Sequence, residues 1–245
     1  MGTKADSAGK AAVRRGFMAD QDFFTRYTVA LALFILFGFA QFSLRGFVDV
    51  RRAPLLTHVH GVLMVAWLAL AVAQNLLVHR GELRLHRALG WAGVVLVAAI
   101  AVAGVSVGFS ALIGHRGPPF FSEPYFLALT TIEPIVFAAM VAWGISLRRK
   151  TEYHRRAMLG SLVVLLEPAL GRVLPMPLMN GWGEWTIVAL QLLALLLLAR
   201  HDRKLLGKVH PVTVSLLGIV LAAHLAVRLL SNFAPFGAFA ERLAA

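Results

Sequence analysis

The stretch ALGWAGVVLVAAIAVAGVSVGFSALI, residues 88–113, contains no charged side chain. A helix rises about 1.5 Å per residue, so about 20 apolar residues cross the hydrocarbon core of a bilayer, which is about 30 Å thick. A charge-free run of this length is typical of a membrane-spanning helix. The stretch therefore predicts a transmembrane helix.

Similar apolar runs recur along the whole chain. We expect seven membrane-spanning helices, at residues 27–44, 58–78, 87–113, 125–147, 155–174, 183–199 and 211–230. The fifth run is the most polar, because it holds Glu167, Pro168 and Arg172. The segments between the runs are too short for an aqueous domain. The predicted fold class is therefore all-α, a polytopic membrane protein with one seven-transmembrane-helix bundle.

This membrane domain is expected to occupy residues 24–232. Residues 1–23 are polar and basic and lack the short apolar core of a signal peptide, so we interpret them as a basic cytoplasmic tail. Residues 233–245 are interpreted as a short tail on the outer side of the membrane.

The composition of the 245-residue chain supports this class and removes several kinds of chemistry. Hydrophobic residues make up 59% and charged residues only 15%, which excludes a disordered chain and argues against a soluble domain. The chain has no Cys, which excludes disulfides, thiolate metal sites and cysteine nucleophiles. Any cofactor must therefore be held by His, acidic residues, Met or Tyr.

The basic residues predict the orientation. With seven helices, 17 of the 24 Lys and Arg residues lie on the side of the N-terminus and 7 on the other. The positive-inside rule then places the N-terminus in the cytoplasm and the C-terminus outside. Because the excess charge lies in short loops beside the membrane, it indicates contact with anionic lipid headgroups and not a nucleic-acid partner.

Two histidines begin predicted helices at the same depth. His86 begins the third helix and His154 the fifth, each beside basic residues, and His210 stands in a similar place before the last helix. A cation at a helix N-terminus opposes the helix dipole, so these imidazoles are expected to be neutral. A neutral imidazole can be a hydrogen-bonded residue at the headgroup level or a metal ligand. The sequence leaves both interpretations open.

A second group of ionisable residues is predicted in the outer half of the membrane. It comprises Glu133, Glu167, Arg172, His224 and Arg228, with His58 and His60 at the outer start of the second helix. Burying an unpaired charge there is costly, so these side chains should face the interior of the bundle. In the structural interpretation, the two Glu residues are protonated or are neutralised by the two Arg residues.

The functional interpretation is a metal or proton-handling site. It would be built from His58 or His60 together with Glu133, Glu167 and His224, a ligand set that suits iron or zinc. His58 and His60 are about 200° apart around a helix, so one of them must face away from such a site. We favour His60 as the inward residue, because it shares a face with Trp67 and other residues of an inner stripe.

The third helix carries small residues on the face that begins at His86. The face includes Gly90, Gly93, Gly104 and Gly108. Small residues at this spacing allow two helices to approach closely. They would also allow a flat ring to lie against the backbone, but close packing is the favoured interpretation.

Part of this pattern resembles a known family. The elements are His58-Val59-His60-Gly61-Val62-Leu63-Met64, then Leu77-Val78-His79-Arg80, then Leu85-His86. They resemble the second and third helices of the cytochrome b-561 group, whose members are transmembrane di-haem electron carriers. The resemblance implies that His86 and His154 hold a cytoplasmic haem b and that His58 or His60 is one ligand of an outer haem. The predicted fourth helix has no His, however, so the second outer ligand is missing and Glu133 occupies that helix.

The whole chain is also similar to a family of bacterial predicted membrane proteins with no established activity. The shared elements are His-x-His-Gly at 58–61, Leu-His-Arg-x-Leu-Gly at 85–90 and His-x-Arg-x-Met at 154–158. This resemblance covers most of residues 24–230 and implies a multi-pass protein of the bacterial cytoplasmic (inner) membrane.

Three functions follow as hypotheses. The first is a haem b-binding electron carrier that uses His86 and His154 and passes electrons between a quinol or another redox partner and an acceptor. The second is a membrane enzyme with an outward-facing site of His and carboxylate ligands for iron or zinc. The third is an accessory or assembly subunit that binds other subunits of a respiratory or photosynthetic membrane complex.

Overall fold

The structure is a computed structural model of the whole chain, and it describes residues 4–175 and 181–245, with side chains from residue 20 onward. All regular secondary structure in the described ranges is helical, which confirms the all-α prediction. The helices are α1 (Lys4–Leu44), the 3-10 helix η1 (Val50–Arg52), α2 (Leu55–Arg80), α3 (Leu83–Ile113), α4 (Glu123–Ser146), α5 (Thr151–Val164), α6 (Leu166–Val173), α7 (Gly183–Leu206), α8 (Pro211–Ser231) and α9 (Ala234–Ala244).

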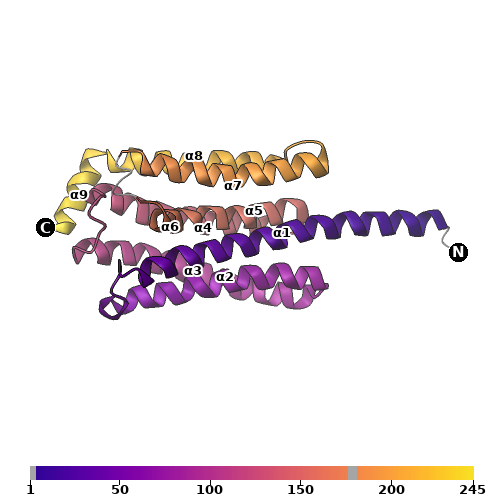
Figure 1. Cartoon of the computed structure of the whole chain (residues 1–245), viewed down its shortest axis with the longest axis horizontal. Helices are drawn as coiled ribbons and strands as arrows, with labels where there is room; N and C mark the ends of the chain where they lie inside the picture. The colour runs from indigo at the N-terminus through magenta and orange to yellow at the C-terminus, as the bar shows by residue number, and fades with distance from the viewer. Residues whose placement is uncertain (1–3, 176–180) are drawn as a thin grey trace.

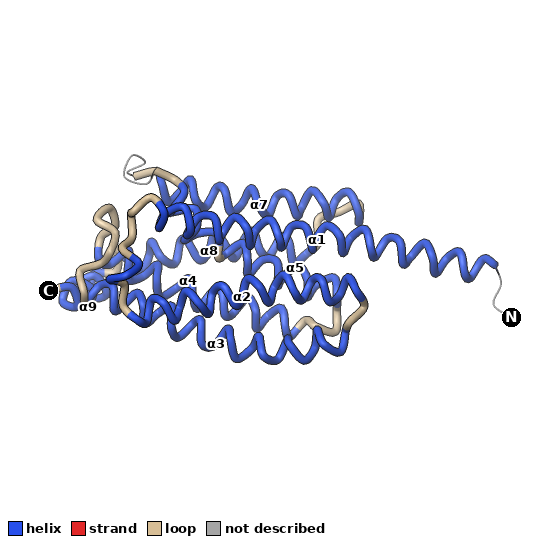
Figure 2. Tube along the Cα trace, turned by 60° about the horizontal axis from the view of Figure 1, so that its bottom comes forward, coloured by secondary structure: helices blue, strands red, loops and turns tan. Residues whose placement is uncertain are grey.

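Six of these helices are long and apolar enough to cross a bilayer. They are the Asp20–Leu44 part of α1 together with α2, α3, α4, α7 and α8. The long helices lie side by side along one axis, and the two termini lie at opposite ends of the bundle (Figures 1 and 2). The chain is therefore a multi-pass helical membrane protein.

The two predicted tails are helical. Residues 4–23 continue α1 without a break, and the N-terminal part of α1 projects beyond the bundle (Figure 1). Residues 234–244 form α9, which lies across the end of the bundle that holds the C-terminus (Figure 1). Hydropathy did not predict either helix, because neither is long and apolar enough to resemble a membrane span.

α5 and α6 occupy the interior of the bundle. Each of them contacts α1 and α7, and α5 also contacts α4 and α8. Most of α5 is buried, including its two arginines, Arg155 and Arg156. Because neighbouring helices cover this segment, it does not need the apolar surface that lipid contact requires. Its polar sequence follows from its central position.

The helix breaks between α5 and α6 where proline removes a backbone donor. Pro168 lacks the amide that would donate to the carbonyl of Val164 in a continuous helix. The side chain of Gln191 on α7 supplies donors instead: its Nε2 lies 3.1 Å from the oxygen of Val163 and 3.2 Å from that of Val164. The break is therefore stabilised by a neighbouring helix, as proline breaks at membrane depth require.

The small residues of α3 allow close helix packing. A Cβ atom at Gly104 would lie 3.0 Å from Cγ of Pro134, and one at Gly108 would collide with the side chain of Thr130. Both partners are on α4. This face thus packs against α4, as the favoured interpretation of the stripe predicted.

Candidate functional site

His86 and His154 meet between α3 and α5. Their ring centroids are 6.4 Å apart and the ring planes are perpendicular, at 90°. Nδ1 of His154 lies 2.7 Å from the backbone oxygen of Gly144 on α4. Nδ1 of His86 is buried without a hydrogen-bond partner. The structure therefore brings together the two histidines that the sequence singled out at the starts of two helices.

This spacing fits two imidazoles that share one metal ion. Metal–nitrogen distances of about 2.0–2.1 Å on both sides leave the two nitrogens about 4 Å apart and the ring centroids about 6 Å apart. If Nδ1 of His154 donates its proton to the oxygen of Gly144, Nε2 carries the lone pair that a metal needs. A ligand histidine is commonly oriented in this way by its second nitrogen.

Gln74 holds the backbone at His86, and few atoms cover the nearby backbone of α3 at Gly90. Gln74 on α2 donates from Nε2 to the backbone oxygen of His86 at 3.1 Å. One turn further along α3, a Cβ atom at Gly90 would meet only Nε2 of Gln74, at 3.6 Å. A group beside His86 could thus approach the backbone of α3 at Gly90.

Near the start of α2, His60 faces the bundle and His58 is exposed. The ring of His60 lies against α3 and α4, because a Cβ at Gly104 would be 3.3 Å from its Cε1 as well as touching Pro134. Its Nδ1 is buried without a partner. The inward orientation expected for His60 is therefore confirmed.

Glu133 on α4 and Glu167 on α6 lie close enough for their charges to act on each other. The charge of Arg172 also acts on Glu167. Even so, within the described part of the chain neither carboxylate is within 4.0 Å of a cation. Arg172 instead lies over the ring of Phe39, 4.1 Å from its centroid, and donates to the backbone oxygen of Pro168 at 2.8 Å.

His224 belongs to a different cluster, between the first turns of α7 and the last turns of α8. Its ring packs against that of Trp185, with centroids 4.8 Å apart, and its Nε2 is buried without a partner. Arg228, one turn further along α8, pairs with Glu184 at 3.2 Å. The expectation that Arg228 neutralises Glu133 or Glu167 is therefore wrong. Sequence reasoning missed Glu184 because an acid at the start of a helix usually faces water.

The predicted metal set does not assemble. It comprised His58, His60, Glu133, Glu167 and His224. His58 is exposed, and His224 lies with Glu184 and Trp185. Across residues 4–175 and 181–245, no three His, Asp or Glu side chains come close enough to hold one metal ion. Of that set, Glu133 and Glu167 lie near each other, and His60 lies beside the contact of Gly104 with Pro134.

A buried ion-pair network, which the sequence analysis did not predict, joins α1, α5 and α7. We call it the Asp202 network; it comprises Asp20, Glu152, Arg155, Arg156 and Asp202. Arg155 pairs with Asp20 of α1 and with Glu152, and Arg156 pairs with Glu152 and with Asp202 of α7. Buried charges need such partners, since an isolated one would be strongly destabilising. Arg155 and Arg156, which count among the 17 basic residues on the side of the N-terminus, are thus buried and paired.

His210 extends this network to α8. Its backbone amide donates to Oδ2 of Asp202 at 3.1 Å, and its ring Nδ1 accepts a hydrogen bond from the amide of Val212 at 3.2 Å. Burial, together with the nearby positive charge of Arg156, lowers the pKa of His210. The ring is therefore a neutral cap of α8.

Among the described residues, the His86–His154 pair has a spacing that suits a prosthetic group, whereas the Asp202 network and the Arg228–Glu184 pair consist of ion pairs. Comparison with other proteins adds no further constraint on this choice: no protein-family model, no curated protein and no solved structure matches the chain.

Proposed function

We propose that the protein is a haem b-binding electron carrier of the membrane, in which His86 and His154 would hold the iron of one haem. The observation that carries the proposal is the separation of 6.4 Å between the two ring centroids. Two neutral imidazoles from neighbouring helices are a common ligand set for haem, and the bound group would supply one-electron transfer.

Each residue around the pair has a separate part in this proposal. The hydrogen bond from His154 to Gly144 fixes the ring and directs Nε2 away from α4. The bond from Gln74 to the oxygen of His86 fixes the start of α3. A ring that is held by its surroundings loses less conformational freedom when it binds a ligand, and the hydrogen bond to its second nitrogen makes it more basic.

The outer half of the bundle supports a site for the electron donor. His60 lies beside Gly104 and Pro134, and its unpartnered Nδ1 can donate or accept one hydrogen bond. A quinol must give up protons as well as electrons, and a neutral histidine can accept one of these protons. We therefore place the quinol or other redox partner on this side of the bundle.

This function requires the two sites to face opposite sides of the membrane. We propose that α5 and α6 together make a seventh crossing, which supports a cytoplasmic N-terminus and an outer C-terminus. The opposite positions of the termini in Figure 1 fit an odd number of crossings.

The test is the visible spectrum of the detergent-purified protein from haem-replete bacterial cells. We expect the sharp bands of a six-coordinate b-type haem on reduction and about one haem per chain by extraction. His86→Ala and His154→Ala should each lose most of the haem. The matched control is His79→Ala, because His79 lies near the same end of the bundle but is partly exposed and pairs with Asp22.

The outcome that contradicts the proposal is equally direct. A colourless protein that is folded by size-exclusion chromatography would refute haem binding. So would full haem content in both His86→Ala and His154→Ala. Loss of haem from His79→Ala to the same extent would show that the loss reflects general destabilisation.

A further inference from the structure

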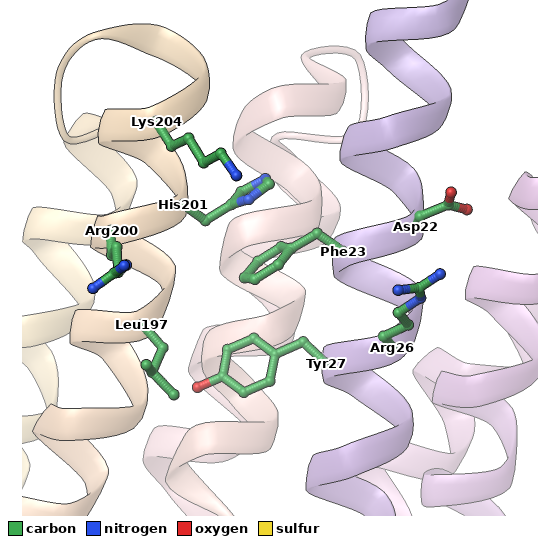
Figure 3. A pocket seen from close by; sticks show the side chains of 8 residues that line it. All are labelled: Asp22, Phe23, Arg26, Tyr27, Leu197, Arg200, His201 and Lys204. Carbon is green, nitrogen blue, oxygen red and sulfur yellow. The ribbon is translucent and has the colours of Figure 1, made fainter.

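A groove runs between α1 and α7 near the end of the bundle that carries most basic residues (Figure 3). Its apolar side chains include Phe23, Tyr27 and Leu197. Phe23 stacks on His201, with ring centroids 3.7 Å apart, and the hydroxyl of Tyr27 donates to the oxygen of Ala194 at 2.5 Å. These contacts make a fixed apolar floor between two helices.

Three cations border this groove. Arg26 is on α1, and Arg200 and Lys204 are on α7; all three are exposed. In Figure 3 the amine of Lys204 extends over His201 toward α1. Considering every described residue, none of the three has a carboxylate within 4.0 Å.

The acidic groups nearby are already paired. Asp22, which also lines the groove, lies 3.3 Å from Nδ1 of His79 on α2. Asp20 accepts from His201 at 2.7 Å and pairs with Arg155. The groove therefore has an excess of positive charge that the protein does not neutralise.

The depth of the cations restricts what can neutralise them. The apolar runs of α1 and α7 end at these cations. Arg26 directly precedes the run 27–44, and Arg200 directly follows the run 183–199. Both residues therefore lie where the hydrocarbon meets the headgroup layer, and their long side chains can extend into that layer. A lipid phosphate lies at this level, next to the apolar floor of the groove.

We propose that this groove is a binding site for the phosphate of an anionic phospholipid. Lys204 binds the phosphate above the apolar floor, Arg26 and Arg200 attract the headgroup from the two flanks of the groove, and the glycerol and upper acyl chain lie along Phe23 and Leu197. Leu197 is about half exposed, at 51%, which leaves apolar surface for such a chain. The site is specific in position, unlike the diffuse attraction of basic loops to an anionic membrane surface.

The test measures lipid binding to the full-length protein, delipidated in neutral detergent. Dioleoyl phosphatidylglycerol, dioleoyl phosphatidylcholine and inorganic phosphate are titrated separately, and bound lipid is counted by native mass spectrometry. We expect phosphatidylglycerol to bind at least tenfold more tightly than phosphatidylcholine. Each lost cation should weaken binding about fivefold, which corresponds to about 1 kcal/mol near an anionic headgroup layer.

The test variant is Arg26→Gln, Arg200→Gln, Lys204→Gln. Its matched control is Arg80→Gln, Arg84→Gln, Arg149→Gln, which removes the same charge from exposed residues outside the groove. We expect a loss of more than tenfold in the first and less than twofold in the second. A separate variant, Leu197→Trp, fills the groove without removing charge and should also weaken phosphatidylglycerol binding.

Three results would overturn the proposal. Equal weakening in the two triple variants would mean diffuse attraction. Equal affinity for phosphatidylcholine would remove the role of headgroup charge. Displacement of phosphatidylglycerol by an equal concentration of inorganic phosphate would indicate a free-anion site. If the first triple variant does not fold, unchanged phosphatidylglycerol binding in Leu197→Trp refutes the proposal by itself.

Discussion

The guanidinium group of Arg156 donates two hydrogen bonds to Oδ1 of Asp202, at 2.9 Å from Nε and 2.6 Å from Nη2, and neither side chain is exposed. Oδ2 of Asp202 accepts from the hydroxyl of Thr213 at 2.5 Å and from the amide of His210. Both oxygens of the carboxylate are therefore satisfied. The pair connects α5 to α7 and, through Thr213 and His210, to α8.

We predict that breaking this pair strongly destabilises the protein. Asp202→Asn keeps the shape of the side chain but leaves the charge of Arg156 without its main partner. Removing one partner of a buried ion pair costs about 3–5 kcal/mol. The thermal midpoint in detergent should fall clearly. The double variant Arg156→Met, Asp202→Leu should lose less than Asp202→Asn, because it leaves no unpaired charge.

An exposed ion pair provides the control. Arg52 and Asp49 are 3.3 Å apart, with side chains 89% and 55% exposed. Such pairs contribute little, because water screens them. Arg52→Ala should therefore leave the midpoint unchanged. A fall as large as that of Asp202→Asn would mean that burial does not decide the difference.

A second prediction concerns the break between α5 and α6. Gln191→Leu removes the side-chain donor to the carbonyls of Val163 and Val164. Val163 also accepts from a backbone amide, so the main loss is at Val164, where Pro168 supplies no amide. An unsatisfied buried acceptor costs about 1–3 kcal/mol. Pro168→Ala restores a backbone amide that can donate to Val164. Adding Pro168→Ala to Gln191→Leu should therefore recover part of the lost thermal stability, and no recovery would contradict this account.

The sequence predicted the long apolar helices well, because the bilayer requires a minimum length of apolar residues. The run expected at 211–230 is the helix Pro211–Ser231, and the run expected at 87–113 is Leu83–Ile113. Helices outside the hydrocarbon do not need a long apolar run. Hydropathy therefore did not predict the helical residues 4–23 or the helix Ala234–Ala244.

The candidate site was predicted only in part, for a related reason. His86 and His154 could be paired because both begin helices at the same depth, and depth can be counted along a sequence. Asp202 and Arg156 are 46 residues apart, and their contact depends on the order and rotation of helices. Hydropathy does not encode that information. The same limit explains why Glu184 was not recognised as the partner of Arg228.

A third prediction is a loss of stability on mild acidification. Burial, followed by the charge of Arg156, lowers the pKa of His210 below its ordinary value of about 6.5. Below that pH the unfolded chain binds a proton that the folded protein resists. The stability associated with this group is thus present above pH ~6.5 and is lost as the pH falls.

The variant His210→Asn isolates this effect. Asparagine is a good helix cap and does not titrate, so it can replace the bond to the amide of Val212. The fall in the thermal midpoint between pH 7.5 and 5.5 should be smaller in His210→Asn than in the wild type. Equal falls would assign the acid sensitivity to other groups of the Asp202 network.

A fourth prediction tests the topology. Reporter fusions after Gly81, Lys150 and Gly207 should be cytoplasmic, because 17 of the 24 basic residues lie on that side in a seven-helix arrangement. Fusions after Gly117 and Ala245 should be outside. The fusions after Lys150 and Ala245 together test whether α5 and α6 cross the membrane. If both fusions report the cytoplasm, this segment does not cross the membrane.

The last prediction distinguishes the contributions of Glu133 and Glu167 to stability. Burial, followed by the charge of Glu167, disfavours an ionised Glu133, whereas the nearby cation of Arg172 favours an ionised Glu167. Glu133→Gln removes a carboxyl group whose charged form both effects disfavour, so the thermal midpoint at pH 8 should stay unchanged or rise. Glu167→Gln removes the attraction to Arg172 as well, so its midpoint should be lower than that of Glu133→Gln. If Glu133→Gln is the less stable variant, Glu133 has a stabilising partner, and burial and the charge of Glu167 are not the dominant effects at this site.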